Sequence, residues 1–180
     1  MTTHVALLRG INVAGRPTVP MAALKGTFGR LGLDPIRTYI NSGNVLFTAP
    51  AVNAEQLTQS IEAAIAAEFG FPVGVLVRTA EEVATVADSV PEDWVHDGTM
   101  KCDVFFLWPG IDRPSVLDDV PHNPAIEDLR YVPGAFVRRI DRPNINRSPL
   151  TRMVGTELYR QMTVRNINTV RKLRELTAAG

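Results

Sequence analysis

Two polar segments, one near each end of the chain, hold most of the side chains that could bind a ligand. Near the amino end, Arg9 and Asn12 follow a short apolar run, and Asn41, Ser42 and Asn44 surround a glycine. Amide and hydroxyl groups can read the hydrogen-bonding edge of a ligand, and a guanidinium can hold an anion. The same residue types also build turns, so a purely structural role for this segment stays open.

The second segment begins with Arg147 and Ser148, just before Pro149. A helix is expected to start here, and the free N–H groups of a helix start attract phosphate or carboxylate. An ordinary N-cap by Ser148 explains the same pattern without a ligand. Both readings stay open at this point.

Arg165 and Asn166 lie at the junction between an expected short strand and the last helix. Asn168 or Thr169 is expected to cap that helix. This leaves Arg165 and Asn166 without a local structural explanation, and we therefore predict that they contact a ligand.

The sequence contains no recognised catalytic motif. His4, His96 and His122 lie far apart without metal-ligand spacing, and the chain has no nucleophile elbow, phosphate-binding glycine loop or dinucleotide fingerprint. Cys102, the single cysteine, leads into an apolar segment and is expected to be buried and chemically inert. We predict no metal site, assign no catalytic residue or cofactor, and leave open whether the protein is an enzyme.

Charge falls into three blocks along the 180 residues, although the formal net charge is zero. Residues 1–48 contain five basic residues and one acidic, residues 49–128 three and fifteen, and residues 129–180 eleven and three. Two basic ends that fold together would form a positive face, which favours an anionic ligand. The pI near 6.8 argues against a dedicated duplex-binding protein.

The apolar segments are short. The first, residues 5–8, is followed by Arg9 and is too brief for the apolar region of a signal peptide. No stretch approaches the ~20 apolar residues of a spanning helix. We therefore expect a cytoplasmic protein without a membrane partner.

Residues 1–80 are predicted to form a β-α-β-β-α-β unit, the order of the ferredoxin-like split fold. The first strand is continuously apolar, as in strands buried on both faces, and both helices end at a glycine, Gly32 and Gly70. The Asn-Ser-Gly-Asn turn predicts a hairpin. The predicted strands are residues 5–8, 36–40, 45–47 and 73–77, and the predicted helices are residues 20–31 and 57–69.

Residues 101–180 are predicted to repeat this unit, after a linking helix and an acidic loop at residues 81–100. The chain is therefore predicted to be an α/β (α+β) protein of two ferredoxin-like halves, with mainly antiparallel sheets and helices packed on them. The predicted strands of the second half are residues 104–108, 129–132, 135–140 and 163–165, and its predicted helices are residues 115–120, 149–162 and 169–176.

Four segments resemble a bacterial family catalogued as domain of unknown function 1697: LLRGINVAGR, VPMAALKGTFGRLG, RTYINSGNVLF and VRNINTVRKLREL. The resemblance covers nearly the whole chain and implies the same tandem ferredoxin-like fold, but no activity. Ala14 stands where the family pattern has a glycine, Pro149 where it has a lysine and Ile167 where it has a tryptophan. Whether Ile167 alters a stacking contact with a ligand stays open.

Two hypotheses follow for the function. In the first, an anionic small molecule, such as a nucleotide or a phosphorylated metabolite, binds in a cleft between the two halves. In the second, the protein is a non-enzymatic interaction module whose basic C-terminal helix meets an acidic protein or a nucleic acid. No RNA-recognition surface is expected, because the first strand has no aromatic residue, and no oligomeric state is predicted. The ligand-binding residues of the first hypothesis are Arg9, Asn12, Asn41, Ser42, Asn44, Arg147, Ser148, Arg165 and Asn166.

Overall fold

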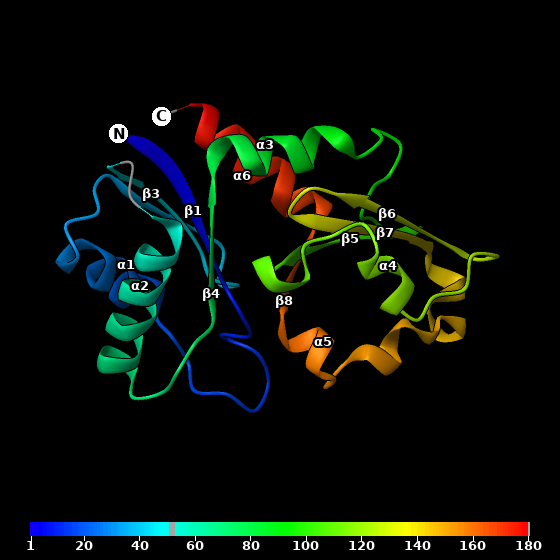
Figure 1. Cartoon of the computed structure of the whole chain (residues 1–180), viewed down its shortest axis with the longest axis horizontal. Coiled ribbons are helices and arrows are strands. Elements are labelled where there is room, and N and C mark those ends of the chain that lie inside the picture. The colour runs from blue at the N-terminus through cyan, green and yellow to red at the C-terminus, as the bar shows by residue number, and fades with distance from the viewer. Residues whose placement is uncertain (51–52, 180) are drawn as a thin grey trace. The chain divides into compact units, whose positions relative to one another are not determined.

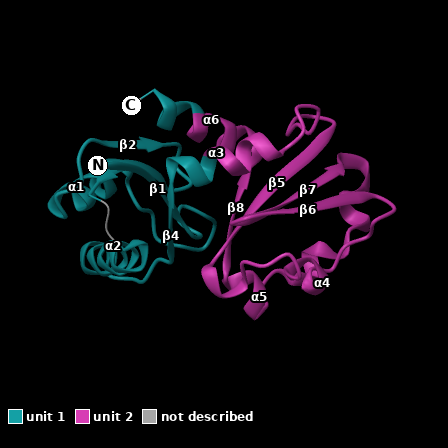
Figure 2. Cartoon of the chain, turned by 45° about the horizontal axis from the view of Figure 1, so that its top comes forward, with its two compact units in different colours: residues 1–83, 175–180 teal, residues 84–174 magenta. Residues whose placement is uncertain are grey.

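A computed structural model describes residues 1–50 and 53–179 (Figure 1). The chain forms two compact units, of which unit 2 comprises residues 84–174 and unit 1 the rest (Figure 2). Both boundaries between the units fall inside helices, α3 (Ala80–Ser89) and α6 (Ile167–Ala178). The predicted linking segment 81–100 is therefore divided, and most of it belongs to unit 2.

Unit 1 contains a four-stranded antiparallel sheet in the order β2-β3-β1-β4. α1 and α2 pack on one face of this sheet, where Phe28, Ile61 and Ile65 meet Phe47 in a buried cluster. The elements of unit 1 are β1 (Thr2–Leu8), α1 (Met21–Arg30), β2 (Ile36–Tyr39), β3 (Asn44–Ala49), α2 (Ala54–Phe69) and β4 (Val75–Thr79).

Local signals in the sequence explain where the elements of unit 1 begin and end. The Asn53 side chain caps α2 by accepting from the Glu55 N–H at 2.8 Å, and Gly70 ends the helix with a positive φ of 78°. At the start of α3, Thr79 and Glu82 form a reciprocal capping box. β1 is buried on both faces as predicted, since residues 5–8 are 0% exposed.

Unit 2 contains a second four-stranded antiparallel sheet, in the order β6-β7-β5-β8. One face of this sheet packs against α4 and the 3-10 helices η1 and η3. In the centre of this face the Phe105 and Phe136 rings stack, with their centroids 4.5 Å apart. Its elements besides parts of α3 and α6 are β5 (Met100–Leu107), η1 (Pro109–Ile111), α4 (Val116–Asp119), β6 (Glu127–Val132), β7 (Ala135–Asp141), η2 (Arg142–Arg147), η3 (Pro149–Met153), α5 (Glu157–Arg160) and β8 (Met162–Asn166).

The predicted helix over residues 149–162 is wrong. The chain forms the 3-10 helix η3, turns at Gly155 with a φ of 87°, and then forms the short helix α5. Met162, predicted to end the helix, is the first residue of β8. A left-handed glycine interrupts a helix because it directs the backbone out of the helical path.

The two sheets repeat the same strand order, so each strand of unit 1 has an equivalent in unit 2. An arginine also occupies a similar position in the last strand of each sheet. In unit 1, Arg78 of β4 pairs with Val5 of β1, and in unit 2, Arg165 of β8 pairs with Val104 of β5. In both units, the arginine donates to the carbonyl of the residue before it, at 3.3 and 2.8 Å. The predicted repetition of the element order is present, while the assignment of each half to the ferredoxin-like class stays a prediction. Within the described residues, no helix has the length and apolarity to cross a membrane.

Candidate functional site

One corner of unit 1 brings together several of the predicted ligand-binding residues, at the loop after β1 and the turn between β2 and β3. Asn12 joins the two segments. Its side-chain amide donates to the carbonyls of Val19 at 3.0 Å and Asn41 at 2.9 Å, and its Oδ1 accepts from the Val19 N–H at 2.7 Å. Both amide protons and the oxygen of Asn12 are thus engaged within the chain, which gives this residue a structural role in the loop.

The β2–β3 turn has a similar internal bonding pattern. Asn44 is 0% exposed, and its amide donates to the Tyr39 carbonyl and to the Ser42 hydroxyl, each at 3.0 Å. Gly43 adopts a φ of 80°, and its carbonyl accepts from the Leu8 N–H at 2.8 Å. These bonds give Ser42 and Asn44 a structural role, which was one of the two readings of the sequence.

A pocket of about 320 Å³ opens between the loop and the turn. Arg16 is its only ionisable lining residue, and the Arg16 guanidinium makes no hydrogen bond or ion pair with any residue that the structure describes. The guanidinium lies against Gly10, whose φ of 64° turns the chain here. The lining residues are Asn12, Val13, Arg16, Thr18, Val19, Pro20, Met21 and Asn41.

The backbone around this pocket adds to its positive potential and is conformationally unusual. α1 starts at the pocket wall, with no side-chain cap at Pro20 and no acidic residue in its first turn. Among the described residues, Asn12 and Ile40 are the non-glycine residues with positive φ, 53° and 50°, and both lie at this corner. A left-handed conformation is costly for a β-branched residue such as Ile40 and is typical of functional loops.

Arg9 does not line this pocket. It is half-buried, and its backbone N–H donates to the Gly74 carbonyl at 2.8 Å, which ties the end of β1 to the start of β4. The predicted convergence of Arg9 with the arginines of the second half stays a prediction.

In unit 2, Ser148 belongs to a buried polar network around Glu127. The Ser148 hydroxyl lies 2.8 and 2.9 Å from the two carboxylate oxygens of Glu127, and the Arg138 Nε donates to the same carboxylate at 2.8 Å. The Asn123 N–H donates to it at 2.8 Å. Ser148 also caps η3, as predicted, by accepting from the Leu150 N–H. The Ser148 hydroxyl is therefore engaged by a carboxylate of the chain itself, while the predicted contact of Ser148 with a ligand stays a prediction.

Ser148 and Arg165 lie on opposite faces of the unit 2 sheet. Ser148 bonds Glu127 on the face that carries Phe105 and Phe136. Arg165 is opposite Val104, whose side chain points away from that face, because successive residues of a strand alternate. The side chain of Arg165 and the hydroxyl of Ser148 thus lie on different sides of this sheet, while the assignment of both as ligand-binding residues stays a prediction. Arg147 is exposed, and its guanidinium donates to the Asn144 side chain at 3.1 Å.

Arg165 is 6% exposed and belongs to the interior of its unit. Its guanidinium donates to the Thr163 hydroxyl at 3.0 Å and to the Val164 carbonyl at 2.8 Å. Burial lowers the pKa of Arg165 to about 10, because desolvation disfavours the charged form. The sequence did not single out its equivalent in unit 1, Arg78, which is also buried.

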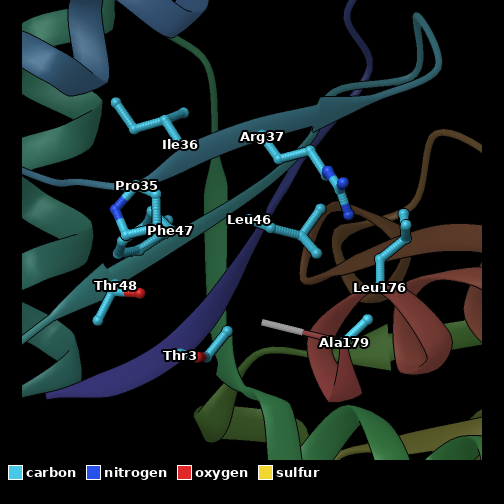
Figure 3. Close-up of a pocket in the computed structure, with 9 residues that line it drawn as sticks. All are labelled: Thr3, Pro35, Ile36, Arg37, Leu46, Phe47, Thr48, Leu176 and Ala179. Carbon is cyan, nitrogen blue, oxygen red and sulfur yellow. The ribbon is translucent and has the colours of Figure 1, made fainter.

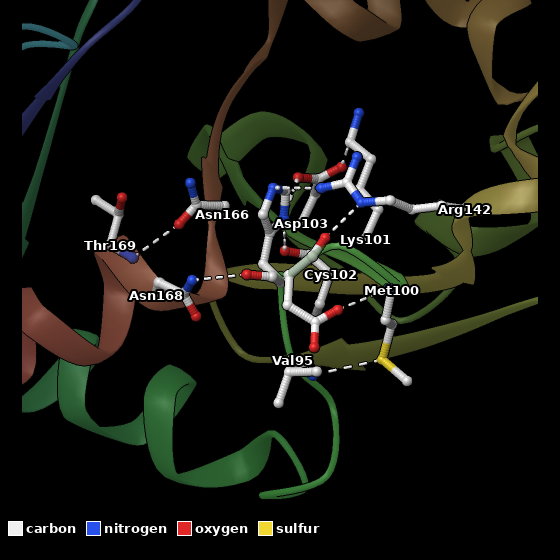
Figure 4. Close-up of polar contacts among 11 residues, drawn as sticks. Val95, Met100, Lys101, Cys102, Asp103, Arg142, Asn166, Asn168 and Thr169 are labelled. Atoms are coloured by element: carbon white, nitrogen blue, oxygen red, sulfur yellow. Dashed lines mark hydrogen bonds and ion pairs between the residues drawn. The ribbon is translucent and has the colours of Figure 1, made fainter.

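The C-terminal motif is explained largely by helix capping (Figure 4). The Asn166 side chain accepts from the Thr169 N–H at 2.9 Å, so Asn166 is the cap of α6. The expectation that Asn168 or Thr169 is the cap is wrong, since α6 begins at Ile167. The Asn168 amide instead donates to the His96 carbonyl at 2.8 Å, which attaches α6 to the loop before β5.

The loop before β5 contains His96 and Asp97, two ionisable residues that bond to neighbouring backbone groups (Figure 4). Hydrogen bonds from the backbone of Thr99 and Met100 hold the pKa of Asp97 below its ordinary value. The His96 Nδ1 lies 3.1 Å from the Cys102 carbonyl and 3.7 Å from Asp103. Across residues 1–50 and 53–179, no group of three His, Cys, Asp or Glu side chains is arranged to hold a metal ion.

Cys102 lies within β5 and is 0% exposed, as predicted. Burial raises the pKa of its thiol to about 12, so the reactive thiolate is about one part in ten thousand at pH 8. We expect a thiol reagent at pH 8 to label the native protein very slowly and the denatured protein at once. Stoichiometric labelling of the native protein within minutes would contradict this expectation.

Together, the fold and the pocket define a class: an α+β protein of two four-stranded antiparallel sheets with a polar pocket in its first unit. Residues 1–136 match the family described as protein of unknown function (DUF1697), and the chain belongs to this family, as predicted. Among solved structures, it is similar to the conserved bacterial protein SP0830 from Streptococcus pneumoniae, with 27% identity, 98% of each chain covered and a TM-score of 0.81. No curated protein matches the chain.

The sequence interpretation missed Arg16 and Thr18, which line the pocket. Arg16 stands between Gly15 and Pro17, and these neighbours could have identified it as a candidate ligand-binding residue. Glycine and proline favour a loop, and a basic residue in a loop is exposed and lies away from the side chains of helices and strands.

Proposed function

We propose that the protein binds a small anionic molecule, such as a phosphate-bearing metabolite, in the pocket between the loop after β1 and the β2–β3 turn. The observation that carries the proposal is the Arg16 guanidinium, which lines the pocket without a hydrogen-bond or ion-pair partner among the described residues. A guanidinium offers planar, paired donors that match phosphate and carboxylate oxygens.

Further groups at the pocket are available to a ligand. The Thr18 hydroxyl and the Asn41 side-chain amide have no partner among the described residues, and both residues are exposed. The first N–H groups of α1, which has ten residues, have no side-chain cap and add a partial positive charge. Residues 1–48 contain one acid, Asp34, which does not line the pocket, so little in this segment opposes an anion.

The roles within the pocket follow from these contacts. Arg16 holds the anion, Asn41 and Thr18 read its remaining oxygens, and Asn12 keeps the loop and the turn together. No general base lines the pocket, so the proposal is one of binding, and any catalysis would depend on positioning and electrostatics.

The alternative function, docking through a basic C-terminal helix, has less support. Arg171 donates to the Pro91 carbonyl at 2.9 Å, and Arg174 lies 2.6 Å from the Asp88 carboxylate. These charges are engaged within unit 2, and an acidic partner would have to compete with the contacts already made.

We expect Arg16→Gln to weaken binding of inorganic phosphate or pyrophosphate at least tenfold, because it removes a charge-assisted contact worth ~1.5–3 kcal/mol. The melting temperature should stay nearly unchanged, since Arg16 is exposed. Titrations followed by amide chemical shifts would measure the affinity, and the wild-type shifts should centre on Thr18 and residues 21–23.

Lys25→Gln is the matched control, because Lys25 is an exposed residue of α1 outside the pocket lining. It removes the same charge and should retain most of the affinity. Equal losses in the two variants would mean that the anion responds only to the general charge of the segment. Shifts confined to other parts of the chain would also contradict the proposal.

A further inference from the structure

A second pocket of unit 1 lies at the outer edge of its sheet and shares no residue with the first (Figure 3). It has a volume of about 310 Å³ and is bounded by the edge strand β2, its neighbour β3 and the last residues of α6. This volume is at the lower end of the range of small-molecule sites. The lining residues are Thr3, Pro35, Ile36, Arg37, Leu46, Phe47, Thr48, Leu176 and Ala179.

The walls of this pocket are mostly apolar. Leu46 projects from β3 on the sheet face opposite the Phe28 cluster, since Val45 and Phe47 on either side of it belong to that cluster. Leu176 of α6 and Ala179, which follows this helix, close the other side, and Leu176 is half-buried. A ligand that fills the space between Leu46 and Leu176 would remove apolar surface from water.

One cationic group enters this apolar space. Arg37 stands opposite Leu46 in the β2–β3 register and therefore projects from the same face. In Figure 3 its guanidinium points toward Leu46 and Leu176. The side chain makes no ion pair or hydrogen bond with the described residues, and no acidic residue lines the pocket.

We propose that this pocket binds a small amphipathic monocarboxylate. The carboxylate lies on the planar fork of Arg37, and the hydrocarbon chain lies against Leu46 and Leu176. A neutral apolar molecule would leave the guanidinium without a counter-charge, and a purely ionic one such as phosphate would leave the apolar walls in water. Both parts of the ligand are therefore needed.

The first test is a series of straight-chain carboxylates, butanoate, hexanoate and octanoate, titrated into the whole protein and followed by amide chemical shifts. Affinity should rise about fourfold for each added methylene until the pocket is full. The shifts should centre on Thr3, residues 46–48 and Leu176. Affinity that does not depend on chain length, or shifts centred on Arg16, would overturn the proposal.

The second test separates the charge from the hydrocarbon. Octanoate should bind the wild-type protein at least tenfold more tightly than octanamide, and Arg37→Gln should remove this difference while leaving octanamide binding nearly unchanged. The control variant Arg30→Gln changes an exposed arginine of α1 that pairs with Glu68 and should preserve the difference. If Arg37→Gln still discriminates octanoate from octanamide as the wild type does, the assignment of Arg37 is wrong.

Discussion

Replacing Gly43 with alanine is expected to lower the free energy of unfolding by about 2–5 kcal/mol. The φ of 80° costs an alanine ~1–2 kcal/mol. In addition, a Cβ at this position would lie 2.7 Å from the Leu8 Cβ and 2.7 Å from the Ile11 Cδ1. Overpacking of this kind costs ~1–3 kcal/mol, because these neighbours are buried and cannot move freely. Urea denaturation followed by circular dichroism would measure the loss.

Gly32→Ala is the matched control for this substitution. Gly32 has a similar φ of 74°, but a Cβ there would meet nothing within 4 Å, so only the backbone penalty of ~1–2 kcal/mol applies. The difference between the two variants therefore isolates the steric contribution of the close approach to β1. Equal losses would show that the backbone at Gly43 relaxes without cost. Because Ile11 precedes Asn12, Gly43→Ala should also weaken anion binding in the proposed pocket.

Glu127→Ala is expected to destabilise the protein by ~3–5 kcal/mol. The Glu127 side chain is 0% exposed, and its removal would leave Arg138, which is 4% exposed, as a buried charge without its carboxylate. The Ser148 hydroxyl and the Asn123 N–H would lose the same acceptor. Denaturant titrations would give the free energy of unfolding, and the double variant Glu127→Leu/Arg138→Met is expected to regain the part of the loss that comes from the unpaired Arg138 charge.

Glu157→Ala serves as the comparison for an ion pair in water. Glu157 and Arg160 have 75% and 65% of their side chains exposed and lie 3.2 Å apart, so the loss should be under ~0.5 kcal/mol. A loss at Glu127 as small as the loss at Glu157 would mean that water reaches the Arg138 guanidinium. Such a result would contradict the structural role assigned to this network.

Much of the fold was predictable from the sequence. Apolar runs identified β1 and β5, spacing identified α1 and α2, and glycines predicted their ends, because each of these signals depends on neighbouring residues. The region after Ser148 was not predictable in this way. Apolar residues there follow helical spacing, but they pack as two separate short turns on the unit 2 sheet, and tertiary contacts override the local pattern.

For the candidate site, the positions of the polar residues along the chain were predictable from the sequence, but their roles were not. Asn12, Asn41 and Ser42 were correctly placed in loops next to strand ends, because strands and turns are local features, whereas Asn44 is the first residue of β3. Their roles were not predictable, since the hydrogen-bond partner of Asn12 lies 29 residues away at Asn41. Arg16 stood out only when the structure showed that it lines a pocket and has no partner among the described residues.

The sequence by itself determined the order of the elements, the family and the segments that carry polar side chains. Only the tertiary structure decided which of these side chains are engaged by the chain itself. Ser148 bonds a carboxylate 21 residues away, and Asn168 bonds a carbonyl 72 residues away. Such partners are brought together by the folding of distant segments around a common core, so the chemistry that remains for a ligand depends on the whole fold.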